Sequence, residues 1–278
     1  MTYKIVMDSC GELPEEYTGD KRFERVPLSL EVGDYCILDD ENFNQAEFLE
    51  KVAAYPLCPK SSCPSPERFM EAFGTEAERV YVITLTSRLS GSHNSACLAK
   101  ALYLEQYPDK KVHVIDSESA SGGLTQIALK IVDMEEEGLP FEKIVEEAEK
   151  FRDGMNTYFV LDNLETLRKN GRLSGMKAVV ASTLSIKPVM CAEKGVIVQR
   201  SQGIGVKKAL GKMCSLFLEE VSETAKRRLI ISHCNAPQRA EFVRKQIMEK
   251  ADFRECILLD TKGVSSMYAN DGGVIITA

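Results

Sequence analysis

Short apolar runs alternate with segments of helical spacing through the first half of the chain. Strands are predicted at 3–7, 23–32, 79–83 and 111–115. Helices are predicted at 44–55, about 92–104, about 122–137 and 140–154. Apolar strands that alternate with helices are typical of a parallel sheet covered on both faces. The pattern therefore predicts an N-terminal α/β/α domain with a parallel sheet over residues 1–154.

The order of elements changes after Gly154. Strands are predicted at 155–161, 186–202, 228–234, 255–260 and 273–277, and the run at 186–202 reads as a hairpin that turns at 193–195. Helices are predicted at 162–171, 174–185, 204–225, 236–251 and 263–269. A hairpin combined with crossover helices requires strands of both directions. We therefore expect a C-terminal α/β domain with a mixed sheet over residues 155–278.

Composition narrows the class of protein. The chain has 278 residues and a formal net charge of −7, so nucleic acid is not an expected partner. The longest uncharged apolar-leaning run, 178–186, is too short to cross a bilayer, and the chain opens with a strand rather than a signal peptide. Nine cysteines without a C-x-x-C pair predict reduced thiols, a cytoplasmic location and no metal site. A monomer is expected.

Four hydroxyl-rich loops follow elements of the first half, at 7–10, 60–69, 86–95 and 115–123. Because ligands of an open parallel sheet bind outside the carboxyl ends of its strands, all four loops could converge on one crevice. Hydroxyls and backbone N–H groups at helix starts favour an anion. A serine before a helix is also the commonest N-cap, so capping explains any single loop more simply. An anion site is therefore predicted from the four loops taken together and not from any one of them.

Two other functions stay open from the residues alone. A serine-dependent hydrolase or transferase needs an elbow and a base, but "GSHNS" at 91–95 lacks the second glycine of the elbow. The three histidines, His93, His113 and His233, show no sequence link to a serine. A phosphate-ligand sensor would use basic side chains, for which Arg88 is one candidate. Hydroxyls without an evident base or metal ligand favour simple binding of a singly charged head group, with no cofactor.

Several segments, in this order and spacing, resemble the DegV family of fatty-acid-binding proteins. They are the opening strand that ends in Asp8-Ser9, "RVPLSLEVGD", "KSSCPSPERF", "TSRLSGSHNSA", "VIDSESASGG", "LDNLETLRKNGRLSG" and "LSIKPVM". The likeness covers nearly the whole chain. It implies a parallel α/β domain joined to an α/β domain with a mixed sheet, which agrees with the pattern of elements. It also implies one long-chain fatty acid, such as palmitate, in a tunnel between the domains.

The resemblance implies particular roles. The fatty-acid carboxylate would be held by Ser61, Ser62, Ser90, Gly91, Ser92 and Tyr268. In some bacteria the family member is the acyl-presenting subunit of a fatty acid kinase whose ATP site lies on a separate protein. The chain itself would then be no enzyme, and Arg172 and Arg200 would be surface residues that face that partner. Tyr268 departs from the pattern, because the family usually has a His-x-Gly-Pro-Gly segment where this chain has "YANDGG".

Overall fold

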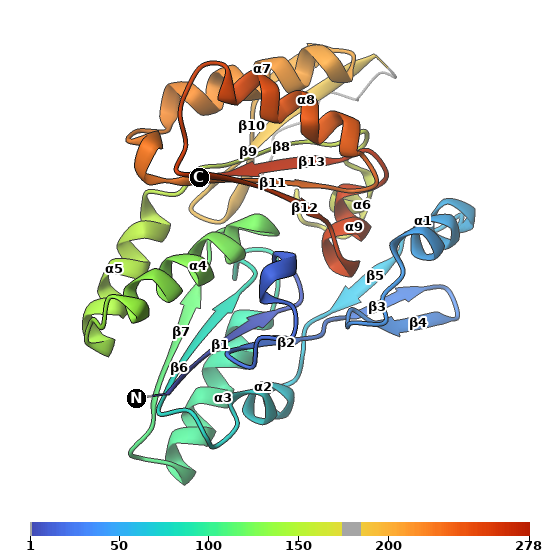
Figure 1. The fold of residues 1–278 in the computed structure, drawn as a ribbon. Helices are drawn as coiled ribbons and strands as arrows, with labels where there is room; N and C mark the ends of the chain where they lie inside the picture. Colours follow the sequence, from blue (N-terminus) through green and yellow to red (C-terminus); the bar gives the residue numbers. More distant parts are fainter. Residues whose placement is uncertain (1, 174–184) are drawn as a thin grey trace.

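A wholly parallel sheet forms the centre of the first half of the molecule. The computed structural model describes residues 2–173 and 185–278 (Figure 1). The strands of this sheet are β1 (Tyr3–Asp8), β2 (Phe23–Val26), β6 (Arg79–Thr84) and β7 (Lys111–Asp116). Their order is β2-β1-β6-β7, and each neighbouring pair is parallel. The predicted parallel sheet is confirmed.

Helices cover both faces of this sheet. They are α2 (Pro66–Phe73) and α3 (Ser92–Gln106) on one face and α4 (Gly122–Glu136) and α5 (Phe141–Asp153) on the other. Side chains alternate between the two faces of a strand. Val80 and Val82 accordingly pack in the cluster that contains residues of α2 and α3. Tyr81 and Ile83 pack in the cluster with α4 and α5, so the strands are buried on both sides.

A mixed six-stranded sheet forms the second half. Its order is β10-β9-β8-β13-β11-β12, and only β11 and β12 are parallel. The strands are β8 (Thr157–Val160), β9 (Ile186–Glu193), β10 (Val196–Ile204), β11 (Arg228–His233), β12 (Glu255–Asp260) and β13 (Val274–Thr277). The predicted mixed sheet and the hairpin at 186–202 are confirmed. The boundary near residue 154 stays a prediction, which the division of strands between the two sheets supports.

The six-stranded sheet has a helical cover on one face and the first half of the molecule on the other (Figure 1). Its cover consists of α7 (Val206–Glu220) and α8 (Pro237–Met248). On the opposite face, the start of α4 contacts β11 and β13. A Cβ added at Gly122, the first residue of α4, would lie 2.7 Å from Ile230 Cγ2. Glycine at this position therefore allows the close approach of the two halves.

A third, smaller sheet was not expected from the sequence, although the helix beside it was predicted at 44–55. Residues 29–62, which we call the arm, form a three-stranded antiparallel sheet of order β4-β3-β5 with one helix. The elements are β3 (Ser29–Val32), β4 (Tyr35–Leu38), α1 (Gln45–Ala54) and β5 (Lys60–Ser62). The prediction of one strand region at 23–32 was wrong, because the chain leaves the parallel sheet after Val26. Pro27 has no N–H to continue the ladder.

The shorter elements complete the described part of the chain. They are α6 (Glu165–Lys169), α9 (Gly263–Ala269) and the 3₁₀ turns η1 (Glu15–Tyr17) and η2 (Thr224–Lys226). The helix predicted at 204–225 is shorter than expected, because β10 runs to Ile204 and α7 ends at Glu220. The helix predicted at 174–185 falls almost entirely outside the described residues. Among the described residues, none of the helices is both long and apolar enough to cross a membrane.

Candidate functional site

A cavity of about 310 Å³ lies where the carboxyl ends of the parallel strands meet the six-stranded sheet. Each of the four hydroxyl-rich loops contributes to its lining, so the predicted convergence is confirmed. The loop residues are Cys10; Ser61, Ser62 and Cys63; Thr86, Leu89, Ser90 and Gly91; and Glu118, Ser119, Ala120 and Ser121. For the loops at 7–10, 86–95 and 115–123, the convergence follows from the parallel sheet, because β1, β6 and β7 end at the same edge. Ser61 and Ser62 come from β5 of the arm instead.

The remaining wall of the cavity is mostly apolar. It comes largely from the second half of the chain, including the α9 residues Val264 and Ala269, and the first half adds Leu28 and Leu85. The apolar side chains of the second half are Phe159, Leu161, Leu167, Ile197 and Ile275. Which apolar residues face the cavity could not be predicted from the sequence, because a cavity wall and a core have the same composition. A long apolar ligand would contact the six-stranded sheet together with Leu28, Leu85 and α9.

The hydroxyls at one end of the cavity have protons left to donate. Ser90 Oγ accepts from Ser92 N at 3.2 Å, and in the described part of the chain Ser90 donates to no protein acceptor. Ser62 has no side-chain hydrogen bond there and is exposed. Ser61 Oγ and Tyr268 Oη are 3.1 Å apart, so one of the two hydroxyls retains a free proton. We call this end, formed by Ser61, Ser62, Ser90, Gly91 and Tyr268, the cradle.

Tyr268 remains a neutral phenol. Burial raises its pKa above the usual value, and the hydrogen bond with Ser61 and the charge of Arg172 offset this only in part. At neutral pH the phenol therefore keeps its proton and can donate or accept a hydrogen bond, but it is no ready proton carrier. The resemblance placed this residue at the carboxylate site, and the structure puts it beside Ser61 in the cavity wall.

The hydroxyls elsewhere in the cavity are already bonded within the protein. Ser121 Oγ donates to Glu12 Oε2 at 2.7 Å, and Ser265 Oγ donates to the Cys10 carbonyl at 3.1 Å. Ser119 Oγ and Thr157 Oγ1 lie 2.7 Å apart, and Ser119 Oγ donates to the Ala120 carbonyl at 3.4 Å, so both protons have acceptors. Because these groups already have partners, this part of the cavity offers a ligand little beyond van der Waals contact. The cavity can thus accept an anion at the cradle and an apolar chain elsewhere.

Ser92 does not line the cavity, although it was expected in the carboxylate site. It is fully buried, and its Oγ donates to Asp8 Oδ2 at 2.6 Å. The same Asp8 oxygen accepts from Leu85 N at 2.7 Å. Burial raises the pKa of Asp8 to about 6, and the donors Ser92, Leu85 and Cys10 oppose that rise. Ser92 therefore anchors the turn that holds Ser90 and Gly91.

The two arginines expected at a partner surface lie in different places. Arg172 lines the cavity, where its Nε donates to the Leu89 carbonyl at 3.2 Å and its guanidinium lies 5.9 Å from the Tyr268 ring centroid. It is the single cation among the described residues of the lining. Arg200 lies outside this cavity and pairs with Glu193 at 2.9 Å and Glu220 at 3.5 Å. Arg88, the candidate for a phosphate site, is not in the lining either.

None of the three histidines lines the cavity. His93 Nδ1 lies 3.3 Å from Thr84 Oγ1, and His113 Nε2 lies 2.9 Å from Glu149 Oε1. His233 Nδ1 accepts from Ala236 N at 3.3 Å. A Ser-His pair at Ser90 is therefore not formed. The described residues also contain no cluster of three or more His, Cys, Asp or Glu side chains that could hold a metal ion.

Comparisons with known proteins agree with one another. A family model described as "Uncharacterised protein, DegV family" matches residues 2–278. A DegV domain-containing protein of Streptococcus gordonii is 35% identical over 281 residues, which cover 99% of this chain and 98% of the relative. The crystal structure of a DegV family protein from Ruminococcus gnavus ATCC 29149, with vaccenic acid, has a TM-score of 0.97 and 46% identity, with both chains fully covered.

A further similar structure is the Fatty Acid Kinase (Fak) B3 protein of Streptococcus pneumoniae, loaded with linoleic acid. Its TM-score is 0.90 at 32% identity, and the match covers 100% of this chain and 99% of that one. The likeness therefore extends over the whole described fold, including both larger sheets.

Proposed function

Because the chain belongs to the DegV family, we propose that it binds one long-chain fatty acid in the cavity between its two larger sheets. The carboxylate lies in the cradle of Ser61, Ser62, Ser90, Gly91 and Tyr268, and the acyl chain lies along the apolar wall. The observation that carries the proposal is the polarity of the cavity. Hydroxyls with unused protons belong to the cradle, and Ser119, Ser121, Thr157 and Ser265 of the same lining are bonded within the protein.

The acyl chain supplies most of the affinity. Each buried methylene contributes about 0.8 kcal/mol, so a chain with about fourteen methylenes gains on the order of 11 kcal/mol before ordering costs. Hydrogen bonds to the carboxylate replace bonds to water, and their net contribution is roughly 1.5–3 kcal/mol each. The cradle therefore mainly sets the orientation of the fatty acid, with its carboxylate toward Ser62 and Ser90, and adds less to the affinity.

Similar proteins support a long acyl chain rather than another apolar ligand. The Ruminococcus gnavus protein was solved with vaccenic acid, and the Streptococcus pneumoniae protein was loaded with linoleic acid. A serine hydrolase has less support, because none of the histidines lies in the cavity wall. A phosphate sensor also has less support, because a phosphate site would more usually use several basic groups and the described lining has Arg172 alone.

The proposal extends to presentation of the carboxylate to a separate kinase. Its support is the 32% identity with the Fatty Acid Kinase (Fak) B3 protein and the exposure of Ser62, which places the cradle near the surface. In this role the chain binds and orients the acid and leaves phosphoryl transfer to the partner. Arg172, in the cavity wall beside Tyr268, is better placed for the partner than Arg200, whose charge is shared by two carboxylates.

The proposal places the protein in the cytoplasm as a monomer. All nine cysteines are free thiols, and this supports a reducing compartment such as the cytoplasm. Cys10 and Cys63 line the cavity itself without forming a disulfide. Size-exclusion chromatography with light scattering measures the oligomeric state directly.

The direct test is to identify what the protein carries. Protein made in bacteria should retain one acyl chain per molecule through purification, because the buried tail dissociates slowly. Native mass spectrometry should show a single added mass, and extraction into organic solvent should yield a long-chain fatty acid. After the lipid is stripped, calorimetry with vaccenic and palmitic acid should show one site. A nucleotide or sugar phosphate in the extract, or stripped protein that binds neither acid, contradicts the proposal.

A further inference from the structure

The cradle is assembled from three segments that are distant in sequence. The arm supplies Ser61 and Ser62 from β5, the loop before α3 supplies Ser90 and Gly91, and α9 supplies Tyr268. Strand β5 pairs only with β3, which belongs to the same arm. Backbone pairing therefore does not fix where β5 lies relative to α9. Some other contact must hold the two segments at the distance that lets Ser61 reach Tyr268.

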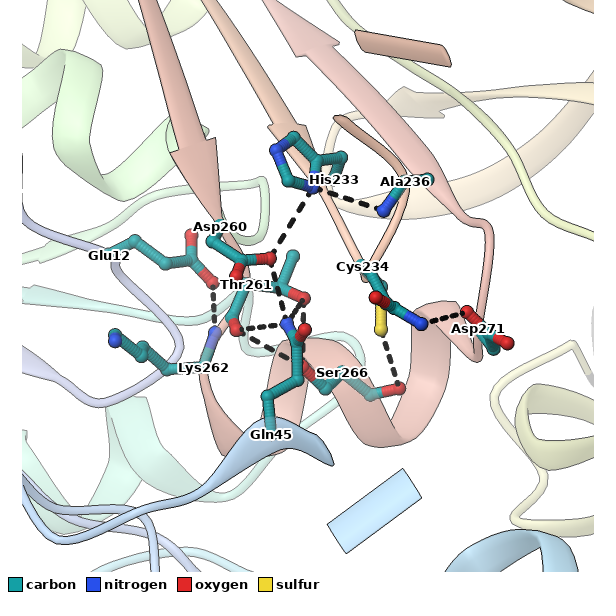
Figure 2. A network of polar contacts seen from close by, with 11 residues as sticks. Glu12, Gln45, His233, Cys234, Ala236, Asp260, Thr261, Lys262, Ser266 and Asp271 are labelled. Atoms are coloured by element: carbon teal, nitrogen blue, oxygen red, sulfur yellow. Dashed lines mark hydrogen bonds and ion pairs between the residues drawn. The ribbon is translucent and has the colours of Figure 1, made fainter. Parts of the chain in front are cut away.

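Gln45, the first residue of α1, bridges the arm to the segment that begins α9 (Figure 2). Its side-chain Nε2 lies 2.9 Å from Asp260 Oδ1 and 2.8 Å from the Thr261 carbonyl. It also lies 3.2 Å from Thr261 Oγ1 and 3.3 Å from Ser266 Oγ. Asp260 Oδ1 and the Thr261 carbonyl can only accept hydrogen bonds, so the amide nitrogen rather than its oxygen must face them.

The contact of Gln45 is connected to the cradle through α9. Ser266 Oγ lies 2.8 Å from Thr261 Oγ1 and donates to the Thr261 carbonyl at 3.2 Å, so α9 and Thr261, two residues before its start, form one bonded unit. Tyr268 follows Ser266 by two residues on the same short helix. Its hydroxyl returns to the arm at Ser61, 3.1 Å away. Gln45 and Ser61 thus hold the arm to α9 at two separate points.

Other contacts between the arm and α9 do not replace Gln45. Leu49, one turn later on α1, packs in the same apolar cluster as Tyr268 and Ala269. Apolar packing is non-directional and tolerates sliding. Asp39 accepts from Gly263 N and Val264 N at 2.7 and 2.8 Å, but it lies at the base of the arm, just after β4. Gln45 adds directional bonds on the helix of the arm itself.

We propose that Gln45 is a positioning residue for the head-group cradle: its amide fixes the arm against the start of α9 and thereby sets Ser61 against Tyr268. This inference rests on the proposed function, because the cradle is its object. It assigns Gln45 no contact with the ligand, since Gln45 is not in the cavity lining. Its effect on binding is transmitted through Ser61.

The test is a double-mutant cycle with Gln45→Met and Ser61→Ala. Methionine has nearly the volume of glutamine and suits a helix, but it cannot donate. In the wild-type background, Gln45→Met should weaken binding of palmitic acid by about threefold to tenfold. This is the loss expected when one hydrogen bond between Ser61 and the carboxylate is no longer well positioned. In the Ser61→Ala background the same change should have less than about a twofold effect, because coupled sites are not additive.

The matched control is Tyr35→Phe, which removes an arm hydroxyl whose bond to Glu47 stays within the arm, at 3.4 Å. It should leave palmitic acid binding unchanged. Equal losses from Gln45→Met in both backgrounds, or no loss in either, would overturn the inference. Equal losses would mean that Gln45 acts on the molecule generally rather than through Ser61.

A measurement without ligand separates this inference from the proposed function. In the ligand-free protein, Gln45→Met should speed amide hydrogen exchange in 60–62 and 263–269 and leave β1 and β6 unchanged. If the wild-type protein binds no fatty acid, the proposed function fails, and the exchange experiment still decides whether Gln45 holds the arm. Unchanged exchange in both segments would overturn the positioning role on its own.

Discussion

At the scale of single residues, the serines of the hydroxyl-rich loops divide by where their protons go. Ser62 and Ser90 keep a proton for a ligand, as far as the described residues show. Ser92 donates to Asp8, and Ser9 donates to Asp39 at 2.9 Å, so both are part of the buried framework. A buried carboxylate needs such donors, because its desolvation is otherwise costly. Residues of the same type in the same loop thus have different roles.

Substitution of Ser90 and Ser92 should separate these roles. Ser90→Ala should weaken palmitic acid binding about tenfold or more, because one hydrogen bond to the carboxylate is lost. It should change the free energy of unfolding little. Ser92→Ala removes a donor from buried Asp8 and should lower the free energy of unfolding by about 1–3 kcal/mol. Calorimetry and urea unfolding measure the two quantities.

The division of roles would be wrong if Ser90→Ala destabilised the fold without changing affinity. It would also be wrong if Ser92→Ala abolished binding at unchanged stability. Thr125 offers a comparison, because it is not in the cavity lining. Its Oγ1 donates to the Glu12 carbonyl at 2.5 Å. Thr125→Val should follow the Ser92 pattern, with a loss of stability and little direct effect on the ligand.

At the scale of elements, the start of α9 is built around the arm. Asp39 accepts hydrogen bonds from the first two N–H groups of this helix, which have no partners within it. The carboxylate can come this close because residue 263 is glycine. A Cβ there would lie 2.5 Å from Asp39 Cγ and 2.6 Å from Leu30 Cδ1. The position of Tyr268, five residues later, therefore depends on a glycine that is not itself in the cavity lining.

Two glycine substitutions in helices should have opposite effects. Gly263→Ala should destabilise the protein by roughly 2–4 kcal/mol, because the methyl group displaces Asp39 from a packed site. Gly211→Ala, in the middle of α7, meets nothing within 4 Å and should stabilise by about 0.5–1 kcal/mol. Thermal and urea unfolding of the two variants give the comparison. Equal effects would mean that the contact with Asp39 does not matter.

At the scale of the whole molecule, buried polar contacts join the two halves. Arg228 of β11 pairs with Asp133 of α4 at 2.7 Å. Glu12 accepts from Ser121 Oγ in the first half and, at 3.4 Å, from Lys262 N beside α9. Burial raises the pKa of Glu12 to about 7, and hydrogen bonds from Ser121, Ser265 and Lys262 only partly oppose it. The contact between the halves should therefore respond to pH.

The free energy of unfolding should fall as pH rises from 5 to 8. In the unfolded chain Glu12 titrates near its usual value of 4.5, so between about 4.5 and 7 the folded state binds the proton more tightly. The resulting stabilisation is fully present below pH 4.5 and is lost as the pH rises through 7. It amounts to about 3 kcal/mol. The pKa of Asp8 is also raised, to about 6, so its ionisation likewise lowers the free energy of unfolding as the pH rises.

Glu12→Gln should remove the part of the pH dependence of the free energy of unfolding that comes from Glu12. The variant should be more stable than the wild type at pH 8 and should show a flatter dependence between pH 5 and 8, measured by urea unfolding. Glu136→Gln is a suitable control, because that carboxylate is largely exposed on α4. A wild-type stability that rises with pH over this range would contradict the assignment.

Local sequence patterns were enough to predict the order of most elements, the parallel and mixed sheets and the loops that line the cavity. Strand and helix periods are local properties of the chain, and the direction of the strands then places all their carboxyl ends at one edge. This direction explains why the loop with Ser90 and Gly91 lies at that edge, whereas Ser61 and Ser62, on β5 of the arm, were placed beside it by the family resemblance. The family resemblance added Tyr268, which no local pattern would have singled out.

Four features could not be read from the chain before it folds: the arm, the absence of Ser92 from the cavity lining, the place of Arg172 in the cavity wall and the contact of Gln45 with Asp260. Each depends on a contact between distant positions, such as the 84 residues from Asp8 to Ser92 or the 215 from Gln45 to Asp260. The physical reason is that a hydroxyl or amide has the same chemistry wherever it lies. Whether its proton serves the fold or a ligand depends on the acceptor that folding places beside it.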